Sequence, residues 1–492
     1  MITLGVDCGT SSLKAALVGE DGATIASAAS AYRPDAPRPH WSEQDPEVWV
    51  AAMFAALGDL RRQAPQAFGA AGAIGFSGQM HGAVLIDRAG RALRPAMLHN
   101  DGRAHREARE LWERHRALAD VVGVKPMPGF TGPKLLWVKR NEPEVFAALD
   151  CVLQTKDYLR LRLTGARGAD MSDAAGAWWL DEAARHWSHE ALAACGVDPA
   201  QVPALTEACD PVGTLLPTVA DELGLPRSTL VAAGGGDAAV GAVGIGAVRP
   251  GDAFISLGTA TQLVVVSDAY RAAPDRLVHS FAHALPGRWY RMAAMLNGAG
   301  ALAFVARLVG IEVATLEAEA ASDYRGPGET IALPYLSGER TPHDDPYARA
   351  VFFGLGESAS RVDLARAMME GVALTLAEAR DCLAATGDVV TRVDLIGGGA
   401  RSALWTRMIA AALNCEVIRR VGAEVGPALG AARLARLAAS GEAPEAVCLA
   451  PPVADVTRPE PRLVEAFAAA RERFGDLYRT LKPEFAKSAA GR

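Results

Sequence analysis

The sequence contains no long run of lysine or arginine, the feature that usually accompanies binding to nucleic acid or to an anionic membrane surface. Its 492 residues include 50 Lys and Arg against 57 Asp and Glu, which gives a formal net charge of -7 at pH 7. A mildly acidic chain without a basic cluster favours small polar partners. We therefore expect neither nucleic acid nor a membrane among its partners.

The seven cysteines form no C-x-x-C pair, the spacing typical of zinc sites and redox motifs. They are scattered along the chain, at Cys8, Cys151, Cys195, Cys209, Cys382, Cys415 and Cys448. This pattern predicts neither a zinc site nor a disulfide framework, and it favours a reducing compartment. A signal peptide and an uninterrupted apolar segment of membrane-spanning length are also missing. These absences together predict a cytoplasmic protein.

The phosphate-binding sequence G-x-x-x-x-G-K-[ST] does not occur, which disfavours a P-loop enzyme. Half of the residues are hydrophobic and 22% are charged, as in soluble globular proteins. The length exceeds that of one ordinary hydrophobic core, so length alone predicts roughly two to four domains.

The N-terminal residues have the pattern of a β-hairpin followed by a helix. Residues 2–6 and 13–18 are apolar strands on either side of a turn of small residues, and Gly19 to Gly22 have turn chemistry. Asp45 before Pro46 is a helix N-cap with proline at the first helical position. Residues 73–76 then form a buried strand. Strands that alternate with helices predict an α/β fold.

The same order begins again past the middle of the chain. Residues 253–257 form a strand that leads through a Gly-Thr turn into a second strand at 262–266. A third strand is predicted at 393–396, followed by helices over 404–413 and near 430–437. Pro250-Gly251 is a turn signal between the two starts. We therefore expect one domain over residues 1–248 and another over 249–492, the second ending in a helix after Pro461.

The first hairpin turn has the composition of a phosphate-binding turn. It contains a carboxylate, backbone N–H groups, hydroxyls and one cation, on Asp7, Gly9, Thr10, Ser11, Ser12 and Lys14. Glycine lets the backbone approach an anion, hydroxyls donate to phosphate oxygens, and an acid at a strand end can hold Mg²⁺ through water. The alternative is an ordinary glycine-rich hairpin turn. Gly258-Thr259 at the matching place in the second half favours a polyphosphate site between the halves.

Asp237 is the candidate general base. It follows an apolar strand at 229–233 and the glycine bend Gly234 to Gly236, which leaves space around its carboxylate. The alternative is an aspartate that caps the next helix. Gln79, Met80 and His81 lie in a turn after another strand and offer hydrogen-bond partners to a polyol, although a lone histidine is more often structural.

Two further glycine clusters follow strands in the second half. Gly298 to Ala303 matches the dinucleotide pattern G-x-G-x-x-G/A, but it lies deep in the second half instead of opening a first βαβ unit. We therefore discount an oxidoreductase. The backbone of Gly397, Gly398, Gly399 and Ala400 is a bare surface on which adenine can rest, or simply a tight strand-to-helix turn.

An ordered series of motifs resembles the FGGY family of carbohydrate kinases across nearly the whole chain. The similar stretches are residues 77–82, 128–137, 156–160, 170–173, 336–343 and 426–430. The resemblance implies two ribonuclease H/actin-like domains with a ligand cleft between them. It further implies that the first domain binds the sugar, the second binds ATP, and the cleft closes during turnover.

The resemblance also implies a role for each candidate residue. Asp237 is the catalytic base and Asp7 organises Mg²⁺ and phosphate. The sugar would be bound by Gln79, Met80, His81, Asn100, Asp101 and Arg103. ATP and its phosphates would be bound by Gly9, Thr10, Ser11, Ser12, Lys14, Gly258, Thr259, Gly397, Gly398, Gly399 and Ala400. The implied reaction transfers the γ-phosphoryl group of MgATP to the terminal hydroxyl of D-xylulose, and a homodimer is implied as well.

Three departures from the family pattern bear on the choice of sugar. Ala238 stands where asparagine commonly helps to hold the sugar, His99 replaces a tryptophan, and Ala260 lies in a turn that is more often Thr-Ser-Gly. Another ketose or polyol, such as D-ribulose or an alditol, is therefore an alternative substrate. An actin-like or chaperone-like ATPase is a more remote alternative, because the same fold houses such proteins.

Overall fold

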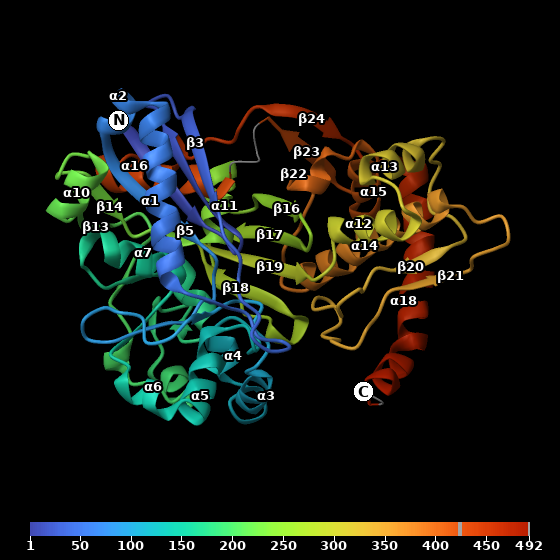
Figure 1. The fold of residues 1–492 in the computed structure, drawn as a ribbon. Helices are drawn as coiled ribbons and strands as arrows, with labels where there is room; N and C mark the ends of the chain where they lie inside the picture. The colour runs from blue at the N-terminus through green and yellow to red at the C-terminus, as the bar shows by residue number, and fades with distance from the viewer. Residues whose placement is uncertain (422–425, 491–492) are drawn as a thin grey trace.

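The computed structural model describes residues 1–421 and 426–490 and contains two seven-stranded sheets (Figure 1). The first sheet has the order β13-β14-β5-β1-β2-β3, with β15 also paired to β5. Its strands are β1 (Ile2–Cys8), β2 (Ser12–Val18), β3 (Thr24–Ala31), β5 (Ala71–Gly78), β13 (Pro211–Thr214), β14 (Leu230–Ala232) and β15 (Gly235–Gly236).

The second sheet has the order β18-β19-β17-β16-β22-β23-β24. Its strands are β16 (Ala253–Leu257), β17 (Thr261–Ser267), β18 (Val278–Ala282), β19 (Trp289–Met295), β22 (Arg392–Ile396), β23 (Glu416–Arg420) and β24 (Val453–Thr457). In each sheet a hairpin, β1–β2 or β16–β17, is followed by a parallel strand, β5 or β22, against its first strand. The expected pair of ribonuclease H/actin-like halves is confirmed.

The helices cover both faces of each sheet. In the N-terminal half they are α1 (Pro46–Gln63), α2 (Pro65–Gly69), α3 (His105–Arg114), α4 (Leu118–Val121), α5 (Thr131–Asn141), α6 (Pro143–Ala148), α7 (Thr155–Thr164), α8 (Met171–Ala174), α9 (His189–Ala194), α10 (Pro217–Leu223) and α11 (Asp237–Ile245). The later helices are α12 (Ala299–Val309), α13 (Val313–Ala321), α14 (Arg361–Ala384), α15 (Ala403–Leu413), α16 (Gly426–Ser440), α17 (Pro444–Val447) and α18 (Pro461–Ala490).

Short strands and 3₁₀ turns complete the chain between these elements. The strands are β4 (Glu43–Gln44), β6 (Val84–Ile86), β7 (Ala96–Met97), β8 (Cys151–Leu153), β9 (Ala169–Asp170), β10 (Leu180–Asp181), β11 (His186–Trp187), β12 (Leu205–Thr206), β20 (Ile331–Leu333) and β21 (Val351–Phe353). The 3₁₀ turns are η1 (Ala175–Ala177), η2 (Pro199–Gln201), η3 (Pro274–Arg276) and η4 (Gly398–Arg401).

Local sequence signals explain where several of these elements begin. Asp45 caps α1 by accepting a hydrogen bond from the Glu47 amide, with Pro46 at the first helical position, as the sequence predicts. The predicted strands at 73–76, 253–257 and 393–396 correspond to β5, β16 and β22, and the helix expected after Pro461 is α18.

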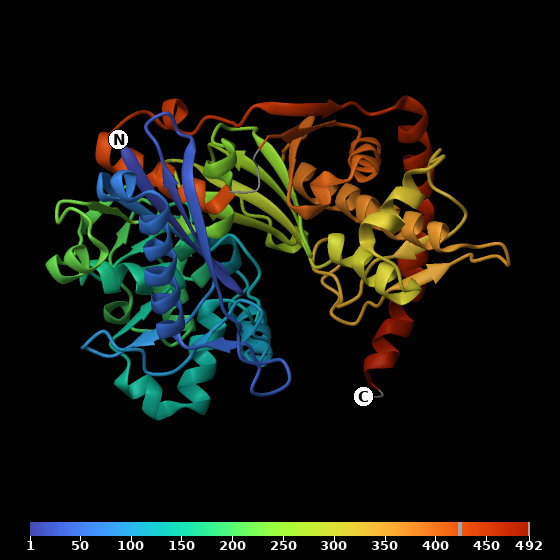
Figure 2. The same ribbon diagram turned by 45° about the horizontal axis from the view of Figure 1, so that its top comes forward.

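Helices α11 and α16 lie between the two sheets (Figures 1 and 2). One face of the first sheet packs on α1 and α7, and its other face packs on α16. Val240 and Val243 of α11 and Leu434 of α16 share a core with Phe254 and Val264 of the second sheet. The other face of the second sheet packs on α12, α14 and α15. The two halves are therefore joined by a common apolar layer.

Helix α16 crosses back from the second half onto the first sheet. A Cβ atom on Gly75 of β5 would lie 2.1 Å from the Ala431 carbonyl oxygen, and one on Gly5 of β1 would lie 1.9 Å from that of Ala428. Only glycine permits such a close approach between strand and helix. Residues 426–440 belong to the predicted second domain but pack on the first sheet. The boundary between residues 1–248 and 249–492 therefore stays a prediction.

Across the described ranges, no single helix has both the length and the apolar character to cross a membrane. Helices α12 and α13 meet the criteria of length and composition when they are taken together, but the chain bends by 100° between them.

Candidate active site

The hairpin turn between β1 and β2 is fixed by hydrogen bonds from neighbouring elements. The Gly9 amide donates to the Ser12 carbonyl at 3.1 Å, and the Tyr32 hydroxyl donates to the Gly9 carbonyl at 2.7 Å. The Thr10 hydroxyl donates to Gln79 Oε1 at 3.1 Å, which ties the turn to the end of β5. The predicted phosphate turn and the predicted sugar loop therefore meet at Gln79.

Asp7 lies near the end of β1, opposite Ser77 of β5 and Lys14 of β2. Its Oδ1 atom is buried and has no hydrogen-bond partner in the part of the chain that the structure describes. Burial raises the pKa of Asp7, while the Ser77 hydroxyl and the Lys14 ammonium act in the opposite direction. A hollow of about 320 Å³ next to Asp7 is also lined by Pro427. An oxygen without a partner at such a place suits a hydrated divalent cation.

Asp237 is the first residue of α11 and follows the bend Gly234 to Gly236. Gly234 has φ +73°, and a Cβ atom there would lie 2.4 Å from the Phe76 carbonyl oxygen, so the bend requires glycine. The N-cap of α11 is Gly236, without a side-chain cap. The alternative interpretation of Asp237 as the cap is therefore wrong. Its carboxylate instead accepts from the Ala238 amide at 2.9 Å, inside the first turn.

The surroundings of Asp237 raise the pKa of its carboxyl group above the value of an aspartate in water. Burial raises the pKa of Asp237 to about 7, and the negative charge of Asp7 adds to this shift. Hydrogen bonds from the amides of Ala238 and Met80 oppose it. A carboxylate with a pKa near neutrality is well matched to accept a proton from a hydroxyl group.

A fully buried ionic network is hydrogen-bonded to the glycine bend at residues 234–236. Lys156 Nζ lies 2.6 Å from Asp157, 2.7 Å from Asp170 and 3.4 Å from Asp173, and all four side chains are inaccessible to solvent. The Asp170 carboxylate binds the Ser172 hydroxyl at 2.5 Å, and Ser172 Oγ accepts from the Gly236 amide at 3.1 Å. The network therefore holds the residue directly before Asp237.

These network residues carry no assigned role in the sequence analysis. Their only signal was their place in two stretches similar to the family, 156–160 and 170–173. Charged side chains are usually solvated, so sequence alone gives no reason to bury four of them together.

Met80 and His81 face the same region from the end of β5. His81 has φ 68°, its Nδ1 lies 2.8 Å from the Gly176 carbonyl oxygen, and its ring packs on Phe130 with centroids 4.3 Å apart. Burial holds the pKa of His81 well below its usual value, so the ring is neutral. Beneath it, Lys134 Nζ donates to the His81 carbonyl at 2.8 Å.

The loop 99–103 divides into exposed and internally paired residues. His99 and Asn100 are exposed, and His99 Nδ1 lies 3.3 Å from Gln79 Oε1. Asp101 and Arg103 are buried and bind one another at 2.6 Å, while Arg103 also pairs with Glu43. The charges of Asp101 and Arg103 are thus engaged within the protein, and their direct contact with a sugar stays a prediction.

In the second half, two glycine turns face a cavity of about 560 Å³. Its lining contains Asp237, Ala238, Gly241, Phe254, Ser256, Gly258, Thr259, Ala260, Gln262, Ile396, Gly397, Gly398, Arg401, Gly426 and Pro427. Gly397 has φ 91°, and a Cβ atom there would lie 2.7 Å from the Leu257 carbonyl oxygen. The cavity therefore joins Asp237 of the first half to the predicted nucleotide turns of the second.

Two residues of the predicted nucleotide surface do not line this cavity. Gly399 is buried against the Leu257 side chain, and the Ala400 carbonyl accepts from Arg419 at 3.2 Å. Arg401, Gly426 and Pro427 line it instead, although the sequence analysis assigned them no role. In the first turn, Ser11 and Lys14 are exposed.

Gly298 and Gly300 pack against the Gly258 turn instead of forming a dinucleotide loop. The Ala299 amide donates to the Gly258 carbonyl at 2.7 Å, and a Cβ atom on Gly298 would lie 2.6 Å from the same oxygen. Strand β19 before this segment is antiparallel to its neighbours. The discounted oxidoreductase motif thus serves to support the turn.

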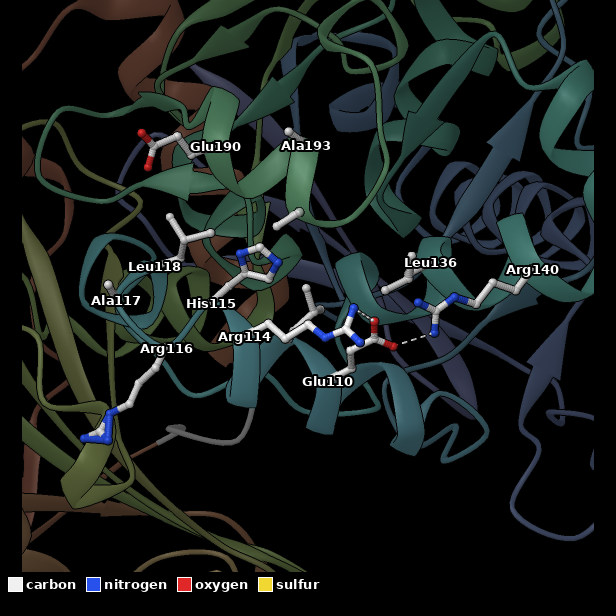
Figure 3. Close-up of a pocket in the computed structure, with 12 residues that line it drawn as sticks. Glu110, Arg114, His115, Arg116, Ala117, Leu118, Leu136, Arg140, Glu190 and Ala193 are labelled. Carbon is white, nitrogen blue, oxygen red and sulfur yellow. Dashed lines mark ion pairs between the residues drawn. The ribbon is translucent and has the colours of Figure 1, made fainter.

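A separate hollow of about 670 Å³ lies between α3, α4, α5 and α9, outside the cleft (Figure 3). Arg114 and Arg140 point toward Glu110 there and form ion pairs with it at 2.8 Å each. None of the candidate catalytic or nucleotide residues lines this hollow.

The comparisons with known proteins agree with this geometry. Residues 2–244 match the N-terminal domain and residues 253–439 the C-terminal domain of the FGGY family of carbohydrate kinases. The chain is 45% identical to the xylulose kinase of Klebsiella pneumoniae over 98% of its own length and 99% of the relative's. Its identity with the xylulose kinase of Escherichia coli strain K12 is also 45%, with the same coverage of both chains.

A solved structure has the same architecture. The crystal structure described as a xyloylose kinase from Brucella ovis superposes with a TM-score of 0.95 and 43% identity, covering 98% of this chain and 99% of that one. The matched domains, the shared fold and the cavity between the halves lead to one assignment. This chain belongs to the FGGY family of carbohydrate kinases.

Proposed function

We propose that this kinase transfers the γ-phosphoryl group of ATP to the terminal hydroxyl of D-xylulose, giving D-xylulose 5-phosphate and ADP. The observation that carries the proposal is the position of Asp237, between the sugar loop after β5 and a cavity lined by glycine turns of the second half. The relatives at 45% identity are xylulose kinases, which supports D-xylulose as the sugar.

Asp237 acts as the general base in this mechanism. As the sugar hydroxyl attacks phosphorus, its proton passes to the Asp237 carboxylate. The rest of the catalysis is positioning and charge neutralisation. The backbones of Gly258, Thr259, Gly397 and Gly398 hold the nucleotide. The amides of Thr10 and Ser11 and the hydroxyls of Ser11 and Ser12, in the first hairpin turn, donate to phosphate oxygens. Met80 and His81 orient the sugar.

Asp7 is the residue best suited to hold Mg²⁺, through water. The buried Oδ1 atom without a partner and the adjoining hollow fit a hydrated cation bound to nucleotide phosphates. Bound there, Mg²⁺ would supply positive charge that offsets the negative charge of the transferred phosphoryl group. A cytoplasmic location and a homodimer remain predictions at this stage.

The substrate is tested by measuring ADP release with D-xylulose, D-ribulose, xylitol and no sugar. We expect D-xylulose to give the highest kcat/KM and the sugar-free rate to be far lower, because water is excluded when the cleft closes. A higher kcat/KM with D-ribulose or xylitol would move the assignment to the other ketose or the alditol, in line with Ala238 in place of asparagine. Undiminished ATP turnover without sugar would instead indicate an actin-like ATPase.

The pH dependence follows from the pKa of Asp237. The base must be ionised to accept a proton, and its pKa is raised to about 7. The value of kcat/KM for the sugar should therefore fall by about tenfold per pH unit below pH 7, where an ordinary aspartate would stay active to about pH 4. Asp7→Asn removes the neighbouring negative charge and should move this acid limb to lower pH, whatever its effect on the maximal rate. An acid limb near pH 4 in the unaltered enzyme would contradict the assignment.

A further inference from the structure

The second half contains a buried polar side chain that the mechanism above does not use. His279 on β18 is completely buried, yet neither ring nitrogen has a hydrogen-bond partner among the residues described. Its ring lies 6.0 Å from that of Phe130 and 5.3 Å from that of Phe281, measured between centroids. Phe130 is the residue on which His81 packs. His279 of the second half and His81 of the first therefore contact the same aromatic ring.

Arg340 lies on a loop that reaches both the strand of this histidine and the first half. Its neighbour Thr341 donates to the Leu277 carbonyl, two residues before His279, and Asp344 of the same loop pairs with Lys125 of the first half. In the described ranges, the Arg340 guanidinium makes no ion pair or hydrogen bond, and burial lowers the pKa of Arg340 itself. Two carboxylates act on it electrostatically, but Glu339 binds backbone amides and Asp344 pairs with Lys125.

The backbone around Arg340 is held rigidly. The Arg340 amide donates to Glu339 Oε1 at 2.8 Å, and Glu339 also binds the Leu296 amide and Asn297. The Thr341 hydroxyl donates to the Leu277 carbonyl at 2.8 Å, next to β18. The Cα atom of Arg340 is therefore held in place next to the second sheet. A guanidinium without a partner among the described residues, on a rigid backbone, is suited to bind a ligand from solution.

The chemistry of the two groups selects oxygen atoms of different kinds. Burial lowers the pKa of His279 to about 3, so its imidazole is neutral and has one donor and one acceptor nitrogen. A hydroxyl group, which both donates and accepts, satisfies such a ring. A guanidinium only donates, so it fits an oxygen that accepts, such as a ketone carbonyl.

We propose that His279 and Arg340 form the part of the ketose site contributed by the second half, with His279 binding a sugar hydroxyl and Arg340 donating to the ketone oxygen. The inference rests on the proposed function and names residues that set its specificity. A sugar held between His81 of one half and these two residues of the other also links sugar binding to closure of the cleft.

The test compares His279→Phe and Arg340→Met with the unaltered enzyme. Phenylalanine keeps the aromatic packing without the nitrogens, and methionine keeps a long chain without the charge. We expect the KM for D-xylulose to rise about 3- to 10-fold in His279→Phe and kcat/KM to fall about 10- to 100-fold in Arg340→Met. The KM for ATP should change by less than about twofold in both. Arg340→Lys should restore part of the loss.

The 2-deoxy analogue of xylitol (pentane-1,3,4,5-tetrol) distinguishes a contact with the C2 oxygen from general damage, because it lacks that oxygen, whereas the C2 hydroxyl of xylitol could still accept from Arg340. The inhibition constant of this analogue against D-xylulose should worsen in His279→Phe but stay nearly unchanged in Arg340→Met. His283→Phe is the matched control, since His283 is another buried histidine after β18 whose Nδ1 already accepts from the Leu285 amide at 3.2 Å. Its KM for D-xylulose should stay near the unaltered value.

Three results would overturn the inference. One is an unchanged KM for D-xylulose in both variants, another is an equal rise in the KM values for sugar and ATP, and the third is an equal loss of D-xylulose binding and of binding of the 2-deoxy analogue in Arg340→Met. Failure of the unaltered enzyme to phosphorylate D-xylulose would instead contradict the proposed function. In that case the same variants are measured with the sugar that does stimulate ADP release, and unchanged kinetics there would also reject the two residues.

Discussion

The Asp237→Ala variant should fold and bind ATP but lose about 10² to 10⁴ in kcat, equivalent to about 3 to 5 kcal/mol of activation free energy. The reason is that Asp237, the base that we propose, would no longer accept the proton of the sugar hydroxyl at the junction of the predicted sugar loop and the cavity of the second half. Turnover is measured by ADP release with saturating D-xylulose and ATP. ATP affinity is measured by calorimetry, and folding by circular dichroism.

A surface aspartate provides the control for this substitution. Asp221 pairs with Arg227 at 2.6 Å on an exposed part of α10, so Asp221→Ala should leave kcat unchanged. Asp237→Asn keeps the shape of the side chain and should lose nearly as much activity as alanine, since an amide does not accept the proton. Near-normal turnover in either Asp237 variant would remove this residue from the role of base.

Gly75→Ala should lower the free energy of unfolding by at least about 1 to 3 kcal/mol, the usual range for an overpacked core. Its new methyl group would lie 2.1 Å from the Ala431 carbonyl oxygen and 3.2 Å from the Ala435 amide nitrogen. Both are backbone atoms of α16, so the whole helix must shift away from the first sheet. Thermal and denaturant unfolding measure the loss.

The same shift should weaken nucleotide binding, because α16 begins at Gly426 and Pro427 on the rim of the cavity. Gly72→Ala is the matched control on the same strand. A methyl group at Gly72 would meet only the side chain of Met1, at 3.3 Å, which is free to move. If Gly75→Ala unfolded at the same temperature as Gly72→Ala, the close packing between α16 and β5 would be wrong.

The free histidine and arginine of the second half could not be identified from their motifs. Residues 336–343 resemble the family, but nothing in that stretch indicates that the Arg340 guanidinium has no counterion among the residues that the structure describes. His279 alternates with Phe281 on a strand, a pattern that equally suits an ordinary core position. Only the packing of β18 against Phe130 gives His279 a place near the sugar loop.

Local patterns were sufficient for the elements that depend on neighbouring residues. The two hairpins, the N-cap of α1 and the glycine bend before Asp237 follow from backbone freedom, capping and turn preferences, which act over a few residues. The motif series likewise placed the chain in its family. These features determine where the candidate groups lie at strand ends and turns.

Tertiary structure decided how those groups meet. The fold places Asp7 of β1 and the short strand β15 before Asp237 on either side of β5, returns α16 to the first sheet, pairs Asp101 with Arg103, and buries Lys156 among three carboxylates. It also sets the pKa values that make proton transfer feasible. Burial and electrostatic coupling depend on which segments surround a group and exclude water from it, and these surroundings form only when the whole chain packs.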